Sequence, residues 1–387
     1  MFSKKTLIFL CIILSAQIGY DANAARRINS AVLRGIEYLY DWKFSEAEDL
    51  FRGVVVKNPS DPMGYFYLAM VSWSRLASGF WTKELVREYG RRIDKSISVA
   101  ERKIQRDQPN SMDYLYLGGA LGYKGRFELM KKKYLSSFFL AVQAVDALKT
   151  SRQMDPDNKD VLFGLGLFDY YTAKFKGVLR FLTYLFVNRN SKEEGLRKLH
   201  EAAEDAVYSS TEAKSMLLHI YLFLEDNEYS KALPIAKELA ARFRNNPRFK
   251  FLQGVSYIRL DMDSKYRQTV EYLNREAGAR TLLQEKTKWR NRAFYLQACY
   301  LLLRGHQREA RSKLNEVLSN SDPSYDPAMA AWPLLKIGMA YDVEGRRKEA
   351  LEYYKKVLGL ANGAGAQFLA EKYMDEPVEE GDPFLAY

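Results

Sequence analysis

The stretch that decides the fold is Gly338-Met-Ala-Tyr-Asp-Val-Glu-Gly345-Arg-Arg-Lys-Glu-Ala350-Leu-Glu-Tyr-Tyr354-Lys-Lys-Val357. Small and apolar residues recur in it every three or four positions, which is the period of an amphipathic helix. Gly345 interrupts this period and predicts a turn between two helices. Small residues at Gly338 and Ala350 let the helices approach closely, and Tyr354 fills the space beside them. The stretch therefore predicts a pair of packed helices.

The same pattern occurs at several other places along the chain. Proline falls mainly between the copies, where it ends a helix. Hardly any of the alternation typical of strands occurs between residues 26 and 360. We therefore expect an all-α chain of about six to eight helix pairs. The copies comprise Gly35, Tyr38, Ala47, Phe51, Val54 and Pro59; Ala144, Leu148 and Pro156; Ala232, Ala236 and Leu239; and Ala298, Leu301, Gly305, Ala310, Leu314 and Val317.

This pattern resembles the tetratricopeptide repeat (TPR), which implies a right-handed solenoid of antiparallel helix pairs. The segment 114–250 contains five further motifs of small and aromatic residues: Tyr-Leu-Tyr-Leu-Gly-Gly-Ala-Leu-Gly-Tyr (114–123), Asp-Val-Leu-Phe-Gly-Leu-Gly-Leu-Phe-Asp-Tyr-Tyr (160–171), Phe-Lys-Gly-Val-Leu-Arg-Phe-Leu (175–182), Glu-Gly-Leu-Arg-Lys-Leu (194–199) and Phe-Arg-Asn-Asn-Pro (243–247). With these motifs the segment resembles a family of exported bacterial tetratricopeptide proteins of unassigned role. More distantly, it is similar to eukaryotic tetratricopeptide proteins linked to inclusion-body clearance and organelle surfaces. Neither resemblance implies catalytic residues.

The resemblance to tetratricopeptide proteins also implies where a partner binds. In that family the first helices of successive pairs line a concave groove, and partner-binding side chains stand at fixed positions on them. Each aromatic residue at such a position has an alternative role in packing between repeats. The expected partner is a protein or peptide of unknown identity. The implied groove residues are Lys214, Tyr221, Arg292, Tyr295, Trp332, Leu335, Met339 and Asp342.

The first 24 residues have the organisation of a secretory signal peptide. Lys4 and Lys5 precede an apolar run over residues 6–16, and Ala22-Asn23-Ala24 forms a cleavage site of small residues. The run is too short for a bilayer, which needs about 20 apolar residues. We therefore expect export to the periplasm or cell envelope with cleavage near Ala24. Export makes nucleic acid an improbable partner.

The charge of the chain is unevenly distributed. The formal net charge is +11 over 387 residues, made up of +1 in residues 1–24, +15 in residues 25–370 and −5 in residues 371–387. We interpret 25–360 as the helical body and 361–387 as a Gly/Ala linker followed by an acidic tail. The tail is either a disordered, solvated segment or one that returns to a basic surface of the body or closes its last repeat.

Two segments have features that a tetratricopeptide repeat does not require. Longer helices are expected at about 79–150, where basic residues cluster either as a solvated face or as a surface for an acidic partner or anionic lipid. The segment 175–187 is nearly apolar all round. It is either a buried helix or an amphipathic element that contacts a membrane or a partner through Phe175, Lys176, Arg180 and Phe181.

No constellation of residues indicates catalysis, a metal or a cofactor. Asp155-Pro-Asp-Asn-Lys-Asp160 lacks the glycine and the final acidic ligand of a calcium loop. Cys299, the only thiol after the leader, sits in an apolar helical run and is expected to be buried. The sequence thus favours a non-enzymatic scaffold or adaptor that mediates protein–protein interactions in the envelope. The alternatives are an envelope protein that binds anionic lipid and, less favoured, an enzyme with an unrecognised groove site.

Overall fold

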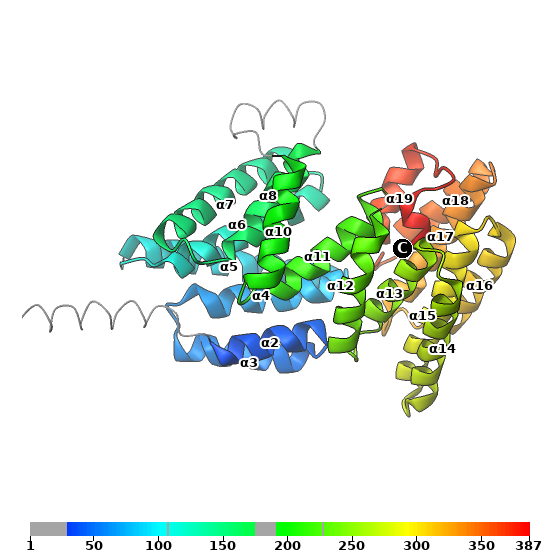
Figure 1. The fold of residues 1–387 in the computed structure, drawn as a ribbon, viewed down its shortest axis with the longest axis horizontal. Helices are drawn as coiled ribbons and strands as arrows, with labels where there is room; N and C mark the ends of the chain where they lie inside the picture. Colours follow the sequence, from blue (N-terminus) through cyan, green and yellow to red (C-terminus); the bar gives the residue numbers. More distant parts are fainter. Residues whose placement is uncertain (1–28, 107, 175–190, 227) are drawn as a thin grey trace, which may run out of the picture.

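A computed structural model describes residues 29–106, 108–174, 191–226 and 228–387. Within these ranges the chain is all-α, as predicted, with 17 α-helices, one 3₁₀ helix and no strand (Figure 1). The helices are α2 (Ser30–Tyr40), α3 (Phe44–Lys57), α4 (Pro62–Ala77), α5 (Lys83–Arg106), α6 (Ser111–Met130), α7 (Tyr134–Met154), α8 (Val161–Ala173), α10 (Lys192–Asp205), α11 (Ser210–Phe223), α12 (Tyr229–Arg242), α13 (Pro247–Arg259), α14 (Asp263–Ala279), α15 (Leu283–Leu303), α16 (Gln307–Asn320), α17 (Pro327–Val343), α18 (Arg347–Leu358), α19 (Ala366–Asp375) and η1 (Pro383–Ala386).

Helices that follow one another along the chain pack against one another. In the described ranges they form eight successive pairs, from α2 with α3 to α17 with α18. The first helices of several neighbouring pairs also touch, as α13 touches α15 and α15 touches α17. Figure 1 shows α5–α8 and α10 on one side of the molecule and α13–α19 on the other, with α11 and α12 between them. The arrangement is compatible with a helical repeat protein.

The spacing of glycine and aromatic residues explains the close approach of paired helices. A Cβ on Gly35 would lie 2.4 Å from the Phe51 ring, and one on Gly338 would lie 2.6 Å from the Tyr354 ring. The two rings are fully buried. Gly345, at the turn between α17 and α18, has a φ of +73°, a conformation that costs glycine little. The glycine and aromatic residues of the sequence pattern therefore determine how closely the two helices of a pair pack.

Three long helices lie between residues 83 and 154. Helices α5, α6 and α7 have 24, 20 and 21 residues. The α6 N-terminus carries a capping box, in which Asn110 accepts from the backbone of Asp113 and the Asp113 carboxylate accepts from the backbone of Asn110. This reciprocal cap satisfies backbone donors that a helix start leaves unpaired.

Segments far apart in the sequence also meet. The Asn246 side chain donates to the Tyr40 carbonyl at 2.8 Å, and the Tyr40 and Phe243 ring centroids are 5.5 Å apart. At another contact, the Trp81 backbone donates to the Asn362 side chain at 3.0 Å, and the Trp81 ring lies edge-on to Phe368. The first helix pair thus touches the α12–α13 turn, and the α4–α5 turn touches α19.

Two predictions lie outside the described residues. They are the signal peptide over 1–24 and the apolar segment 175–187, with Phe175, Lys176, Arg180 and Phe181. In the described ranges no helix combines the length and the hydropathy that a membrane span requires. The acidic end of the chain forms α19 and η1, and η1 contacts α11 and α15. Of the two interpretations of the tail, the structure has the one in which it returns to the body.

Candidate functional site

The last residues of the chain occupy a groove on the body. Residues 383–387 lie against α11, α13, α15 and α17, and Figure 1 shows the C-terminus beside α13 and α17. We call the surface that holds them the tail groove and define it by Phe223, Arg259, Tyr295, Trp332 and Lys336. These residues come from four different helices, so the groove exists only where the helices are packed together.

The tail groove binds the backbone of the tail. Arg259 donates to the Pro383 carbonyl at 2.7 Å, and the Lys336 ammonium donates to the Phe384 carbonyl. The Tyr295 hydroxyl donates to the backbone oxygen of Tyr387 at 2.7 Å. Carbonyl groups buried at an interface need such donors, because an unpaired one costs about 1–3 kcal/mol.

Aromatic rings hold the tail side chains. Phe384 stacks on Phe223 with centroids 5.8 Å apart and an interplanar angle of 11°. The Tyr387 ring lies 4.4 Å from Trp332 and 5.1 Å from Phe223, and it meets His219 edge-on. Trp332 is itself fixed, since its indole N–H donates to the Ala364 carbonyl at 3.0 Å. The tail is therefore anchored at two aromatic positions three residues apart.

Burial changes the pKa values of side chains in and beside the tail groove. Burial lowers the pKa of the Lys336 ammonium to about 8 and that of His219 to about 3, and it lowers the pKa of the Arg259 guanidinium. Burial raises the pKa of the Cys299 thiol to about 11. Cys299 is a buried free thiol, as predicted, and its sulfur faces the Tyr387 backbone oxygen at 3.7 Å. The Lys336 ammonium and the Arg259 guanidinium both donate to tail carbonyls.

The groove residues implied by the repeat resemblance fall into two groups in the structure, those that contact the tail and those that pack or pair within the body. Tyr295 and Trp332 contact the tail directly, as described above. Asp342 reaches another part of it, because its carboxylate accepts from the Val378 backbone at 3.1 Å as well as from Tyr354 and Arg347.

The other implied groove residues serve the body. Leu335 and Met339 have no exposed surface and belong to the core. Tyr221 is buried, with its hydroxyl 2.7 Å from the His200 ring. Arg292 is buried in an ion pair with Asp326, and Lys214 pairs with Glu238. These side chains either pack between helices or neutralise a neighbour.

Several groove residues could not be chosen from the sequence pattern. Phe223, Arg259 and Lys336 lie outside the repeat positions that the resemblance implies, and so does His219, whose ring meets Tyr387. Lys336 did carry a signal, because it is the only charge in the apolar run from residue 327 to 341. A single lysine inside such a run either extends its ammonium to solvent or gives it a buried hydrogen-bond acceptor. Lys336 is fully buried and donates to the Phe384 carbonyl.

The basic cluster on α5–α7 is partly neutralised. Arg92 pairs with Glu48 and Glu88, and Lys103 pairs with the buried Asp113. In the residue 155–160 loop, the Asp160 carboxylate accepts from the Tyr208 and Ser209 backbones. No group of three or more metal-ligating side chains occurs in the described ranges.

In comparisons with known proteins, no family model matches the chain and no curated protein has significant similarity to it.

Proposed function

We propose that the protein is a tetratricopeptide-like solenoid that acts as an interaction scaffold and binds a peptide segment of a partner protein in the tail groove. One observation carries this proposal: residues 383–387 are held there by contacts that a separate peptide could make. Three side chains bind backbone carbonyls, and rings hold Phe384 and Tyr387. Groove recognition of extended segments by such anchors is a recurring mode of peptide binding. The proposal includes no catalysis and no cofactor.

The groove indicates the chemistry of the partner segment. Backbone contacts tolerate many sequences, whereas the Phe223 and Trp332 rings select aromatic side chains three positions apart. The buried positive groups Lys336 and Arg259 disfavour a cationic segment. A partner would therefore present an apolar, aromatic segment free of lysine and arginine, and it would have to displace the tail.

A peptide-binding experiment tests this proposal. A fluorescein-labelled peptide with the sequence of residues 379–387 is titrated into the full chain and into a variant truncated after Asp382, with fluorescence anisotropy as the readout. We expect binding to the truncated chain and at least about tenfold weaker binding to the full chain, whose own tail competes at a high effective concentration. A matched peptide with alanine in place of Phe384 and Tyr387 should not bind.

Further variants keep the result interpretable if truncation unfolds the protein. The full-length Phe384→Ala and Tyr387→Ala variants loosen the tail without removing it, and circular dichroism reports whether they fold. Trp332→Ala in the truncated chain should abolish peptide binding. If folded, truncated protein does not bind the peptide, or if Trp332→Ala leaves binding unchanged, the tail groove is not a peptide site.

One observation favours a second candidate, binding to an anionic lipid surface. Leu135 and Phe139 are 63% and 54% exposed at the start of α7, next to the α6–α7 turn that carries Lys131, Lys132 and Lys133. Apolar side chains beside lysines suit a membrane interface.

Flotation with phosphatidylglycerol liposomes tests whether the protein binds an anionic lipid surface through these side chains. A Leu135→Ser, Phe139→Ser double variant should lose flotation, while Val56→Ser, which removes an exposed apolar residue on α3, should not. Absence of flotation at low salt removes this candidate.

We also propose, from the leader sequence, that the scaffold works in the periplasm or cell envelope. The N-terminal sequence of the protein recovered from a cell fraction tests this. A mature chain that begins at Ala25 in the envelope fraction agrees with the proposal, and an intact leader in the cytoplasm contradicts it.

A further inference from the structure

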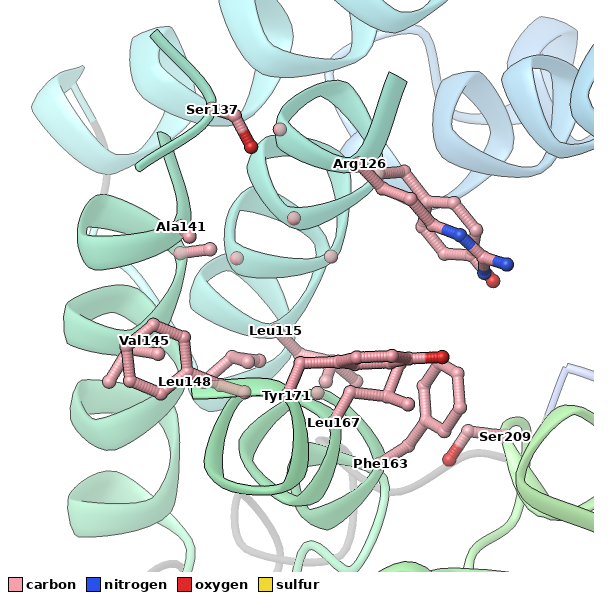
Figure 2. A pocket seen from close by; sticks show the side chains of 18 of the residues that line it. Leu115, Arg126, Ser137, Ala141, Val145, Leu148, Phe163, Leu167, Tyr171 and Ser209 are labelled. Atoms are coloured by element: carbon pink, nitrogen blue, oxygen red, sulfur yellow. The ribbon is translucent and has the colours of Figure 1, made fainter. Parts of the chain in front are cut away.

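A cavity of about 450 Å³ lies between α6, α7 and α8 (Figure 2), and none of the residues that define the tail groove lines it. Glycines on α6 create it. Gly118 is pressed against α7, where a Cβ would meet Leu148 at 2.7 Å, and a Cβ on Gly125 would meet the Ser137 carbonyl at 3.2 Å. Between these two contacts, a Cβ on Gly122 would meet only Ala144, at 3.8 Å. The helices α6 and α7 are thus pressed together at Gly118 and Gly125 and approach less closely at Gly122, which lines the cavity.

Most of the wall on the α7 side is apolar, and Tyr134 and Ser137 are the polar side chains that α7 contributes to it. Ala141, Val145 and Leu148 line it from α7, and Phe163 and Leu167 line it from α8 (Figure 2). Apolar cavities take up apolar molecules in preference to water, since water there lacks hydrogen-bond partners. The volume lies within the range of about 300–1,000 Å³ that is typical of small-molecule sites.

Polar side chains gather at the opposite side of the cavity. Figure 2 shows Arg126 and Ser209 on the side away from α7. Ser209 is engaged, because its hydroxyl and backbone N–H both donate to Asp160. Arg126 lies over the Trp73 ring at 5.2 Å, and no described residue accepts a hydrogen bond or forms an ion pair with its guanidinium. Among the described residues that line the cavity, Arg126 is the only cationic side chain.

We propose that this cavity binds a fatty acid, with the acyl chain against α7 and the carboxylate at Arg126. An apolar chamber with a cationic group at one side matches a ligand that has one apolar chain and one anionic head. A guanidinium binds a carboxylate with two parallel hydrogen bonds, which fixes the head as well as attracting it. Asp160 repels an anion, and the Tyr208 and Ser209 backbone N–H groups both donate to its Oδ1, so the head is placed toward Arg126.

The experiment uses the full chain, freed of bound lipid by extraction, and laurate as the probe. Displacement of an environment-sensitive naphthalene dye measures binding of laurate, of uncharged dodecanol and of acetate. We expect laurate to bind more tightly than dodecanol, and acetate not to bind. Arg126→Gln should weaken the binding of laurate at least about tenfold, since losing even one of the two charge-assisted hydrogen bonds has that effect, and it should leave the binding of dodecanol unchanged. Equal binding of laurate to the wild type and to Arg126→Gln overturns the assignment of the head group.

Filling the cavity is the second arm. Gly122→Phe places a ring in the chamber and should abolish binding of both laurate and dodecanol. Gly90→Phe is the matched control, because Gly90 is a helical glycine on α5 with nothing within 4 Å of its Cβ position. If Gly122→Phe does not fold, Ala141→Trp fills the chamber from the opposite wall. No displacement by laurate in the wild type, or displacement that survives a folded cavity-filling variant, overturns the proposal.

Discussion

The ring of Tyr387, the last residue of the chain, lies 4.4 Å from the ring of Trp332 on α17. This contact joins the end of the chain to a helix that begins 60 residues earlier. A stack of helix pairs leaves an apolar face open at its last pair, and soluble repeat proteins cover that face with a terminal element. Here α19 and the tail lie on it, since Tyr373, Val378 and Leu385 are buried against α17 and α18.

The first prediction concerns the stability that this contact supplies. Tyr387→Ala removes the ring that touches Trp332, Phe223 and His219, and we expect the free energy of unfolding to fall by about 2 kcal/mol, a moderate value because Tyr387 is only partly buried. Chemical denaturation followed by tryptophan fluorescence measures this. Glu379→Ala, an exposed change in the same tail, should have almost no effect. Equal stability of the two variants would show that the Tyr387 ring contributes nothing to the stability of the fold.

The second prediction concerns the helix contact at Gly338. In Gly338→Ala the new methyl group would lie 2.6 Å from the Tyr354 ring, so the helices have to move apart, and we expect a loss of about 1–3 kcal/mol. Gly90→Ala is the control, because its methyl group enters open space and alanine favours helix by about 0.5–1 kcal/mol. The two changes should thus have opposite signs in thermal unfolding. Stabilisation by Gly338→Ala would contradict the close approach.

The third prediction concerns Glu212, whose pKa burial raises from 4.5 to about 7 although Arg248 acts in the opposite direction. Its carboxyl group is hydrogen-bonded to the Tyr40 hydroxyl. Below pH 4.5 the group is protonated in both states, so its contribution to stability is complete. Between pH 4.5 and 7 the unfolded chain ionises first, so the free energy of unfolding falls as pH rises. Above pH 7 the contribution is lost.

Glu212→Gln should remove this dependence. We expect the variant and the wild type to have similar stability near pH 4, and the variant to be more stable by up to about 3 kcal/mol near pH 8. Urea unfolding at both pH values measures the difference, and taking the difference cancels the opposite contribution of His219. A constant offset between the two proteins across this range would mean that Glu212 does not titrate on folding.

Local features of the fold could be predicted, whereas contacts between distant segments could not. The pairs Gly35–Phe51 and Gly338–Tyr354 lie within one helical hairpin each, so a fixed spacing in the sequence encodes them. The contact of Asn246 with Tyr40 depends on how all intervening helices stack. Each helix is rotated slightly relative to its neighbour, and no short sequence pattern encodes the sum of these rotations between Tyr40 and Asn246.

The candidate site shows the same division. The repeat resemblance implied Tyr295 and Trp332 as partner-binding residues, and both contact the tail, but nothing local indicates that Phe384 meets Phe223 or that Lys336 meets a tail carbonyl. The glycines of α6 are visible in the sequence. Which of them is pressed against a neighbour and which borders a cavity depends on where α7 lies, and that is a property of the assembled fold.

The last prediction contrasts two cations that the repeat pattern assigned to the groove. Arg292 is 6% exposed and pairs with Asp326, which is 8% exposed, whereas Lys214 pairs with the exposed Glu238. Asp326→Ala leaves a guanidinium buried without its partner, so we expect a loss of about 3–5 kcal/mol in the free energy of unfolding. Glu238→Ala breaks a solvated pair and should cost less than about 1 kcal/mol.

The double variant Arg292→Met, Asp326→Leu should recover most of the loss, because apolar side chains of similar size need no partner in the core. Denaturant unfolding of the four proteins, including the wild type, measures these differences. If Asp326→Ala costs no more than Glu238→Ala, Arg292 is solvated in the folded protein and is free to bind a partner.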